Sequence, residues 1–292
     1  MKIYRRPIIL GGHINGYNII RELNSEGINE IGLIDYQESS IARFSNKVRH
    51  IGSIDGSKES LLGQLLRAQE LFGNITVFPT DDSHLLLLRD LEKDIKDFCF
   101  IPINTTSLEE SLNKSFQYKA CKEIGIRFPK TMEAYNSSDL DEILDYEFPV
   151  IIKPIFRPAH LNNLFRNFIV RDLEEWNNFK HNIDIYLNEN IPIIISEFIP
   201  GDDTNIYAYT CYRNKHGNIL GEWSGKKLTQ HPDISGVFSS ASNEAPSEIS
   251  ILGRALVDKL NTFGICEPEF KYDHRDGQMK LMEVNLRSMM WH

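Results

Sequence analysis

The chain of 292 residues is long enough for two or three packed units with sizeable cores. With 41% hydrophobic and 25% charged residues, its composition is that of a globular protein. The net charge of −9, without a long basic run, excludes nucleic acid and anionic membranes as partners of the surface as a whole. A local basic pocket for phosphates is still compatible with this charge.

The cysteines and the apolar runs indicate the cellular compartment in which the protein works. Four cysteines lie far apart in the sequence and form no CxxC pair, which argues against a zinc site or a disulfide framework and predicts a reducing, cytoplasmic location. The apolar run 8–10 stops at two glycines and is too short for a signal peptide. No stretch approaches the length of a membrane helix, so we expect no membrane partner.

The first hundred residues alternate between strand and helix signals. Strand 7–10 precedes a helix whose apolar face carries Ile19, Ile20 and Leu23. Strand 31–35, helix 59–72, strand 75–78 and helix 83–91 follow. This β-α-β-α order predicts a parallel sheet.

A glycine-rich turn, 11–16, follows the first strand, and Asp35 comes about 20 residues later. The pattern resembles a dinucleotide fingerprint, in which glycines let a helix N-terminus approach a pyrophosphate. His13 breaks the usual glycine spacing, and many such turns serve packing alone. We favour the packing role.

The pattern changes near residue 104. Helix 108–124 ends at Gly125, and strand 149–153 leads into an irregular stretch, 154–166. Helix 172–181, strand 192–197, a hairpin of 205–212 with 218–222, and helix 247–263 follow. A final hairpin joins 266–273 to 279–285 through an Asp-Gly turn.

Two buried strands end in a charged residue. Lys153 closes an apolar strand, and an unpaired buried ammonium is costly, so an anion should lie near it. Glu197 closes another strand and precedes Phe198 and Ile199, an edge that could read adenine through its backbone. The alternatives are a lysine that reaches solvent from the strand end and an edge glutamate that faces water.

The final hairpin carries the strongest signal. Glu283 and Asn285 face the same side of one strand, and Glu269 lies on the other strand across an Asp-Gly turn. Two carboxylates and an amide oxygen suit Mg²⁺ shared with ATP phosphates, and without a cation these groups should repel one another. Arg287 could steady a phosphate or a substrate carboxylate. The alternative is a set of solvated charges on an outer face.

Taken in order, these residues resemble the ATP-grasp superfamily over nearly the whole chain. In that resemblance Lys114 and Lys153 are the two phosphate-binding lysines, residues 197–199 are the adenine-binding hinge, and Glu269, Glu283 and Asn285 are the metal ligands. Arg287 resembles the reaction-centre arginine, and Lys226 and Lys227 a basic pair near the γ-phosphate. Residues 153–162 and 269–277 are similar to D-aspartate-ligase-like and polysaccharide-cluster members.

The chain also departs from the family pattern. The loop after Lys153 is usually rich in glycine, but residues 154–170 contain none, which implies a different or less mobile lid. Relatives usually continue beyond the last strand, so we expect further substrate-binding segments to be missing from this sequence.

The resemblance implies a fold of class α/β plus α+β. A Rossmann-like domain (1–108) would precede a two-lobed ATP-grasp domain (109–292), with lobes of about 109–190 and 191–292. It implies a carboxylate–amine (or carboxylate–thiol) ligase that acts through an acylphosphate, with ATP and Mg²⁺, or Mn²⁺ in its place. The partners would be a small-molecule carboxylate and an amine, and a homodimer is left open.

Two other classes stay open at this point. One is a nucleotide-binding protein without ligase activity, favoured by the missing glycines and the short C-terminus. The other is a nicotinamide-dependent oxidoreductase, which rests only on the glycine-rich turn. Binding of Mg-ATP and not of NAD would separate the ligase from the oxidoreductase.

Overall fold

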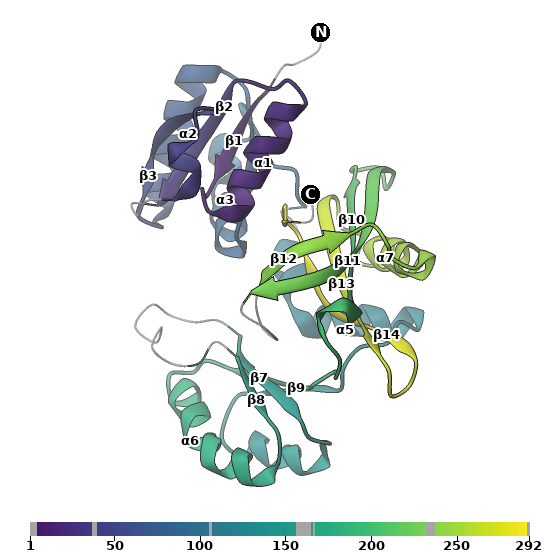
Figure 1. Ribbon diagram of the computed structural model, residues 1–292. Helices are drawn as coiled ribbons and strands as arrows, with labels where there is room; N and C mark the ends of the chain where they lie inside the picture. Colours follow the sequence, from purple (N-terminus) through teal and green to yellow (C-terminus); the bar gives the residue numbers. More distant parts are fainter. Residues whose placement is uncertain are drawn as a thin grey trace.

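The computed structural model describes residues 5–36, 40–104, 107–155, 165, 167–231 and 237–290, without the side chains of 231, 237 and 238. Its strands form three sheets, one after another along the chain. In Figure 1 the five-stranded sheet of the C-terminal part lies between the N-terminal sheet and a four-stranded sheet. A mixed α/β fold with a parallel sheet, as predicted, is confirmed.

The N-terminal sheet is parallel throughout, in the order β3-β2-β1-β4-β5. Its strands are β1 (Arg6–Leu10), β2 (Ile31–Tyr36), β3 (Val48–Ile54), β4 (Ile75–Pro79) and β5 (Cys99–Phe100). The connecting helices are α1 (Ile14–Ser25), the 3-10 helix η1 (Ile41–Phe44), α2 (Lys58–Phe72) and α3 (Asp82–Ile95).

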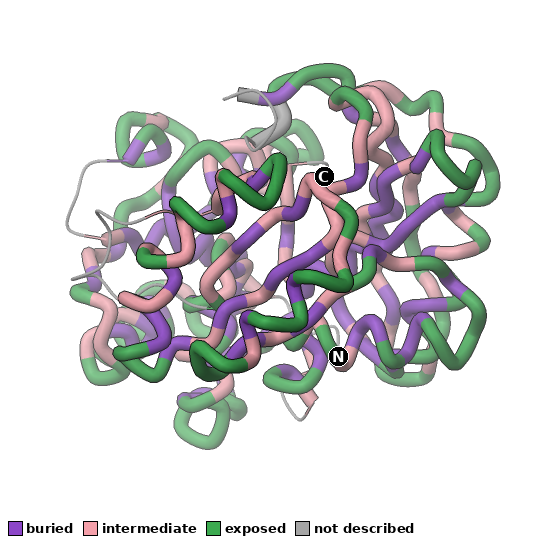
Figure 2. The backbone as a smooth tube through the Cα atoms, turned by 90° about the horizontal axis from the view of Figure 1, so that it is seen from below, coloured by how far each residue is buried: buried purple, intermediate pink, exposed green. Residues whose placement is uncertain are grey.

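Helices cover both faces of this sheet, which explains why β1 is an unbroken apolar run. Ile9 packs with Ile19 and Ile20 of α1 on one face. Ile8 and Leu10 point the other way and join the core that includes residues of α2 and α3. Figure 2 shows buried segments running through the interior, with exposed segments around the outside.

The glycine-rich turn after β1 is tied inward by Asp35. Its carboxylate is fully buried and accepts hydrogen bonds from the backbone N–H of Gly12 (3.2 Å) and from the Ser40 hydroxyl. Gly11 has φ +97°, and a Cβ on Gly12 would lie 2.2 Å from the Ser40 Oγ, so side chains do not fit there. This bonding matches the packing role favoured above.

The second sheet is antiparallel, in the order β6-β9-β7-β8. It consists of β6 (Thr131–Ala134), β7 (Val150–Pro154), β8 (Phe168–Val170) and β9 (Ile193–Glu197), with the helices η2 (Asp139–Asp145) and α6 (Leu173–Asn188). Because β9 pairs with both β6 and β7, it belongs to this lobe, although the expected lobe boundary near 190 would assign it to the next.

The third sheet is also antiparallel, in the order β12-β11-β10-β13-β14. Its strands are β10 (Ile206–Arg213), β11 (Ile219–His231), β12 (Val237–Ser242), β13 (Gly264–Asp273) and β14 (Gln278–Asn285), with α7 (Ser247–Lys259) and η4 (Asp203–Asn205). Among the described residues, no helix is long and apolar enough to cross a membrane. All four cysteines are free and buried, and Cys211 lies opposite Cys266 across β10 and β13.

The single helix expected at 108–124 is two helices, α4 (Leu108–Leu112) and α5 (Lys114–Ile124). Asn113 ends α4 and caps α5, since its side chain accepts from the backbone N–H of Phe116 (3.2 Å). Tyr118, Ala120 and Cys121 of α5 lie in the same core as Leu281 and Val284 of β14. These helices therefore pack on the third sheet, and Ser115 of α5 also donates a hydrogen bond to Glu133 of β6 in the second sheet.

Candidate functional site

The hairpin of β13 and β14 brings charged side chains to one face of the third sheet. Glu269 lies directly opposite Glu283, and Glu267 lies opposite Asn285. A β-bulge makes this possible: Phe270 pairs with Leu281, so Met282 is an extra residue on β14. Leu281 thus stays in the core while Glu283, two residues later, leaves it.

α5 holds β14 in place from its open edge. The Gln117 amide accepts from the backbone N–H of Val284 (3.0 Å) and donates to the carbonyl oxygen of the same residue (3.2 Å), as a neighbouring strand would. One helical turn earlier, the Lys114 ammonium lies 3.1 Å from a Glu283 carboxylate oxygen. The helix therefore delivers a cation to the carboxylate pair.

Lysines neutralise Glu283 in this structure. The Lys114 ammonium is the largest influence and lowers the pKa of Glu283 to about 2 in spite of burial, and Lys153 at the end of β7 adds to it. Burial is the largest influence on Lys114 and lowers its pKa, but Glu283, Tyr118 and Glu269 together outweigh burial, and the pKa is raised. The expected repulsion between the carboxylates is therefore outweighed at Glu283, because Lys114 and Lys153 face it.

Glu269 has a different environment. Burial raises its pKa, and the negative charge of Glu283 acts in the same direction, while Lys227 partly opposes them. The Lys227 ammonium lies 3.8 Å from a Glu269 oxygen and donates to the Gln230 side chain at 3.4 Å. Side chains alternate along β11, so Lys226 is directed to the opposite face, and the expectation that both lysines approach one phosphate is not met.

The segment after β9 joins the two antiparallel sheets. Glu197 ends β9, its carboxylate lies 2.5 Å from the Arg275 guanidinium and 3.5 Å from the Lys280 ammonium, and it accepts from the backbone N–H of Lys130 (3.2 Å). The carboxylate thus links the hairpin turn to the second sheet and does not face water. Ile199 is buried, and the backbone N–H of Phe198 donates to the Pro149 carbonyl (3.1 Å).

Arg287 connects the hairpin to the N-terminal sheet. Its Nε donates to Asp82, the first residue of α3, at 2.6 Å, and its Nη2 lies 3.4 Å from the Asn285 amide oxygen. The neighbouring Ser288 carbonyl accepts from Asn15 of α1 at 2.6 Å. The end of β14 therefore lies against the edge where the parallel strands finish.

The donor set fits a hard divalent cation. Two facing carboxylates and the amide oxygen of Asn285 are oxygen ligands on adjacent strands. No group of three or more His, Cys, Asp or Glu side chains is placed to hold a metal within the described ranges. A metal here would therefore use Glu269, Glu283 and Asn285 together with ligands from a bound nucleotide.

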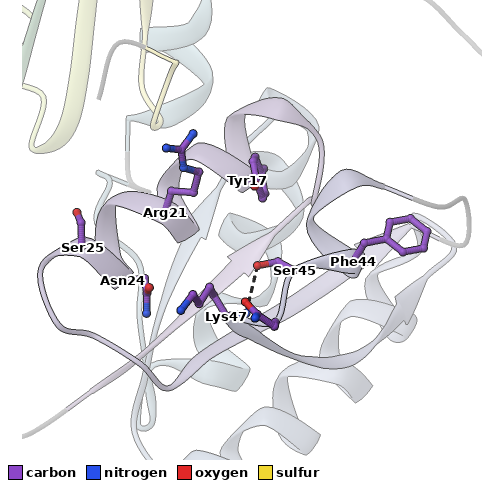
Figure 3. Close-up of a pocket in the computed structure, with 8 residues that line it drawn as sticks. Tyr17, Arg21, Asn24, Ser25, Phe44, Ser45 and Lys47 are labelled. Atoms are coloured by element: carbon purple, nitrogen blue, oxygen red, sulfur yellow. Dashed lines mark hydrogen bonds between the residues drawn. The ribbon is translucent and has the colours of Figure 1, made fainter.

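Two cavities lie away from this charged face. One, of about 480 Å³, is formed by Tyr17, Arg21, Asn24 and Ser25 of α1 and by residues 44–47 (Figure 3). The other, of about 390 Å³, lies along β10 and β11. The first has Phe44 in its wall, and this side chain is 83% exposed. We assign the chemistry to the charged face, where lysines pair with carboxylates.

The comparisons agree on one fold. No protein-family model matches the chain. It is 25% identical over 299 residues to a D-aspartate ligase of Enterococcus faecium, covering 96% of this chain and 70% of that protein. The ADP complex of an N5-carboxyaminoimidazole synthetase from Staphylococcus aureus has a TM-score of 0.73 at 12% identity, over 99% of this chain and 72% of the other. An L-amino acid ligase from Bacillus licheniformis has a TM-score of 0.69 at 16% identity, over 98% and 68%.

The chain shares its fold with these ligases and is similar in sequence to the D-aspartate ligase. In this fold, the lysines 114, 153 and 227 surround the carboxylates that the sequence singled out. Arg287 lies beside Asn285, and residues 197–199 lie where the two antiparallel sheets join. Residues 159–162, part of the subgroup resemblance, fall outside the described residues.

Sequence reasoning missed one carboxylate of this charged face. Glu267 is fully buried on β13, and neither of its side-chain oxygens has a hydrogen-bond partner among the described residues. Its position two residues before Glu269, and so on the same strand face, was the signal available in the sequence.

Proposed function

We propose that this chain is an ATP- and Mg²⁺-dependent carboxylate–amine ligase that acts through an acylphosphate. The observation that carries the proposal is the convergence of three lysines, from α5, β7 and β11, on the facing carboxylates of one hairpin. A phosphoryl-transfer site needs such cations for the phosphates, together with acidic ligands for the metal. The fold and the ligase names of its relatives support the same reading.

In this proposal each residue type has one task. The backbone of residues 197–199 binds adenine, and Lys114 and Lys153 bind the phosphates. Lys227 approaches the γ-phosphate from β11, where it already pairs with Glu269. Glu269, Glu283 and Asn285 hold Mg²⁺, which when bound would neutralise phosphate charge.

The reaction then proceeds in two balanced steps. A substrate carboxylate oxygen attacks the γ-phosphorus, and the bond to ADP breaks. The amine nitrogen attacks the acyl carbon, phosphate leaves, and one proton is released from the nitrogen. Arg287, held beside Asn285, would bind the substrate carboxylate or the transferring phosphoryl group during these steps.

The N-terminal parallel sheet would be the Rossmann-like unit that precedes the ATP-grasp domain. Asp35 does not support nicotinamide binding, because its buried carboxylate is bonded to the turn itself. D-aspartate is the first substrate to test, since the curated relative is named for it, followed by a panel of other amino acids.

Two measurements test the proposal. Calorimetry should detect binding of ATP with Mg²⁺ and no binding of NAD. ADP release should then depend on an amino acid of the panel and on a primary amine. If Mg-ATP does not bind, or if it binds but no carboxylate promotes ADP release, the ligase proposal is wrong.

A further inference from the structure

Glu267 is a buried carboxylate that nothing in the described structure accounts for. It is 0% exposed, and neither Oε1 nor Oε2 has a hydrogen-bond partner among the described residues. Buried polar groups almost always have partners, so an orphaned carboxylate indicates a missing one.

The position of Glu267 separates it from the nucleotide end of the site. Along β13 and β14, the hinge contacts of Arg275 and Lys280 come first, and the pair Glu269–Glu283 comes next. Glu267 and Asn285 form the following pair, further from the hinge. Arg287 then leads to Asp82 of the N-terminal unit. Glu267 thus lies between the carboxylate pair and the N-terminal sheet.

Two plainer roles for Glu267 fit less well. As a third acidic metal ligand it would join Glu269 and Glu283, but no such trio is placed to hold a metal within the described ranges. As a structural group it would be paired, yet even the amide nitrogen of Asn285 opposite it lacks a partner. The missing partner should therefore be a cation that arrives with a substrate.

We propose that Glu267 binds the amine substrate in its ammonium form, which passes one proton to solvent before the neutral nitrogen attacks the acyl carbon. This inference rests on the ligase function proposed above. The two carboxylate oxygens, without a partner among the described residues, suit an ammonium, which has three donors. Arg287 next to Asn285 would hold the anionic reactant, so opposite charges on adjacent residues would orient the two substrates.

Glu267 is covered in this structure, so the amine must displace a side chain to reach it. The amide nitrogen of Asn285, on the residue that pairs with Glu267, also lacks a partner among the described residues, and such a rearrangement could pair it. An amine without a positive charge gains little from Glu267, and this difference makes the proposal testable.

The experiment compares a neutral nucleophile with a cationic one. Glu267→Gln keeps the shape and deletes the charge, and Glu70→Gln, exposed on α2, is the matched control. Hydroxylamine, uncharged at neutral pH, traps the acylphosphate formed from D-aspartate or another active amino acid as a hydroxamate. Primary amines, L-lysine included, are then supplied as the second substrate, and the amount of amide formed measures the second step.

We expect Glu267→Gln to form hydroxamate within about twofold of the wild-type rate. Its KM for the cationic amine should rise about tenfold or more at nearly unchanged kcat, the range expected for one charge-assisted hydrogen bond. The variant should also melt at the same or a higher temperature, because it loses a buried charge without a partner. Glu267→Asp, which keeps the charge, should fall in between, and it carries the test if the glutamine variant does not fold.

Three results would overturn the inference. Loss of hydroxamate and of Mg-ATP stabilisation together would place Glu267 in the metal site, through Asn285. An unchanged KM for the amine would mean that Glu267 does not bind the amine. A wild-type protein that binds Mg-ATP but forms neither hydroxamate nor amide would refute the ligase proposal, and this inference with it.

Discussion

Replacing the two facing carboxylates one at a time should have opposite effects on the protein without nucleotide. In Glu283→Gln the Lys114 ammonium loses a partner at 3.1 Å. The Coulomb attraction at that distance is about 5 kcal/mol for an effective dielectric constant of about 20. The side chains are 24% and 39% exposed, so solvent screening reduces the net loss to about 1 kcal/mol.

Glu269→Gln should behave differently, because burial raises the pKa of Glu269 and its charged form is disfavoured. We expect an unchanged or higher melting temperature for Glu269→Gln, and a fall of about 2–4 °C for Glu283→Gln. Differential scanning calorimetry without nucleotide measures both, with Glu70→Gln as the control.

Mg-ATP should then distinguish both variants from the wild type. A ligand at a hundredfold excess over its dissociation constant stabilises by about 2.7 kcal/mol. The metal-dependent part of this shift should be absent in both variants. If Glu283→Gln melts like the wild type without nucleotide, the ion pair with Lys114 does not stabilise the fold. If both variants keep the full Mg-ATP shift, the metal assignment is refuted.

Three further predictions follow from single residues. Lys153→Met keeps the apolar stem, so the circular dichroism spectrum of the nucleotide-free protein should not change. Calorimetry should show that the affinity for Mg-ATP falls about tenfold or more. An unchanged affinity would mean that Lys153 is a strand-end lysine that reaches solvent. Burial lowers the pKa of His84 from 6.5 to about 4, and the charged or titratable groups near it are Asp81, Arg287, Asp35 and His13. The free energy of unfolding should therefore fall as the pH drops from 6.5 towards 4, because the unfolded state takes up the proton first. The total loss should be about 3 kcal/mol. Urea titrations across this range should show a smaller loss for His84→Phe, which keeps a ring beside Tyr36, and an equal loss would exclude His84 as the source. Gly264 has φ +92°, and a Cβ there would lie 1.8 Å from the Pro102 carbonyl oxygen, so Gly264→Ala should destabilise by about 2–4 kcal/mol in denaturant titration. The control Gly63→Ala, in an open position on α2, should stabilise by about 0.5–1 kcal/mol, and equal effects of the two changes would contradict the close approach at Gly264.

Sequence alone identified the elements whose signal is local. The apolar run of β1, the glycine-rich turn and the Asp-Gly hairpin were all readable, because strand burial and turn chemistry depend on neighbouring residues. The placement of Glu269, Glu283 and Asn285 on facing strands was readable for the same reason, since a hairpin pairs residues at predictable spacings. These elements needed no long-range contact to be predicted.

Tertiary structure alone decided the partners of those residues. α5 packs against β14 and directs Lys114 to Glu283 across 169 positions of sequence, which reversed the expectation that this carboxylate is repelled. The bulge at Met282 turns Glu283 to the site face, and the alternation along β11 removes Lys226 from it. The lack of a hydrogen-bond partner for Glu267 among the described residues could be recognised only once its burial was known. The physical reason is common to all of these: the charge state and the accessible partners of a side chain depend on non-local packing and desolvation, which periodicity along the chain does not encode.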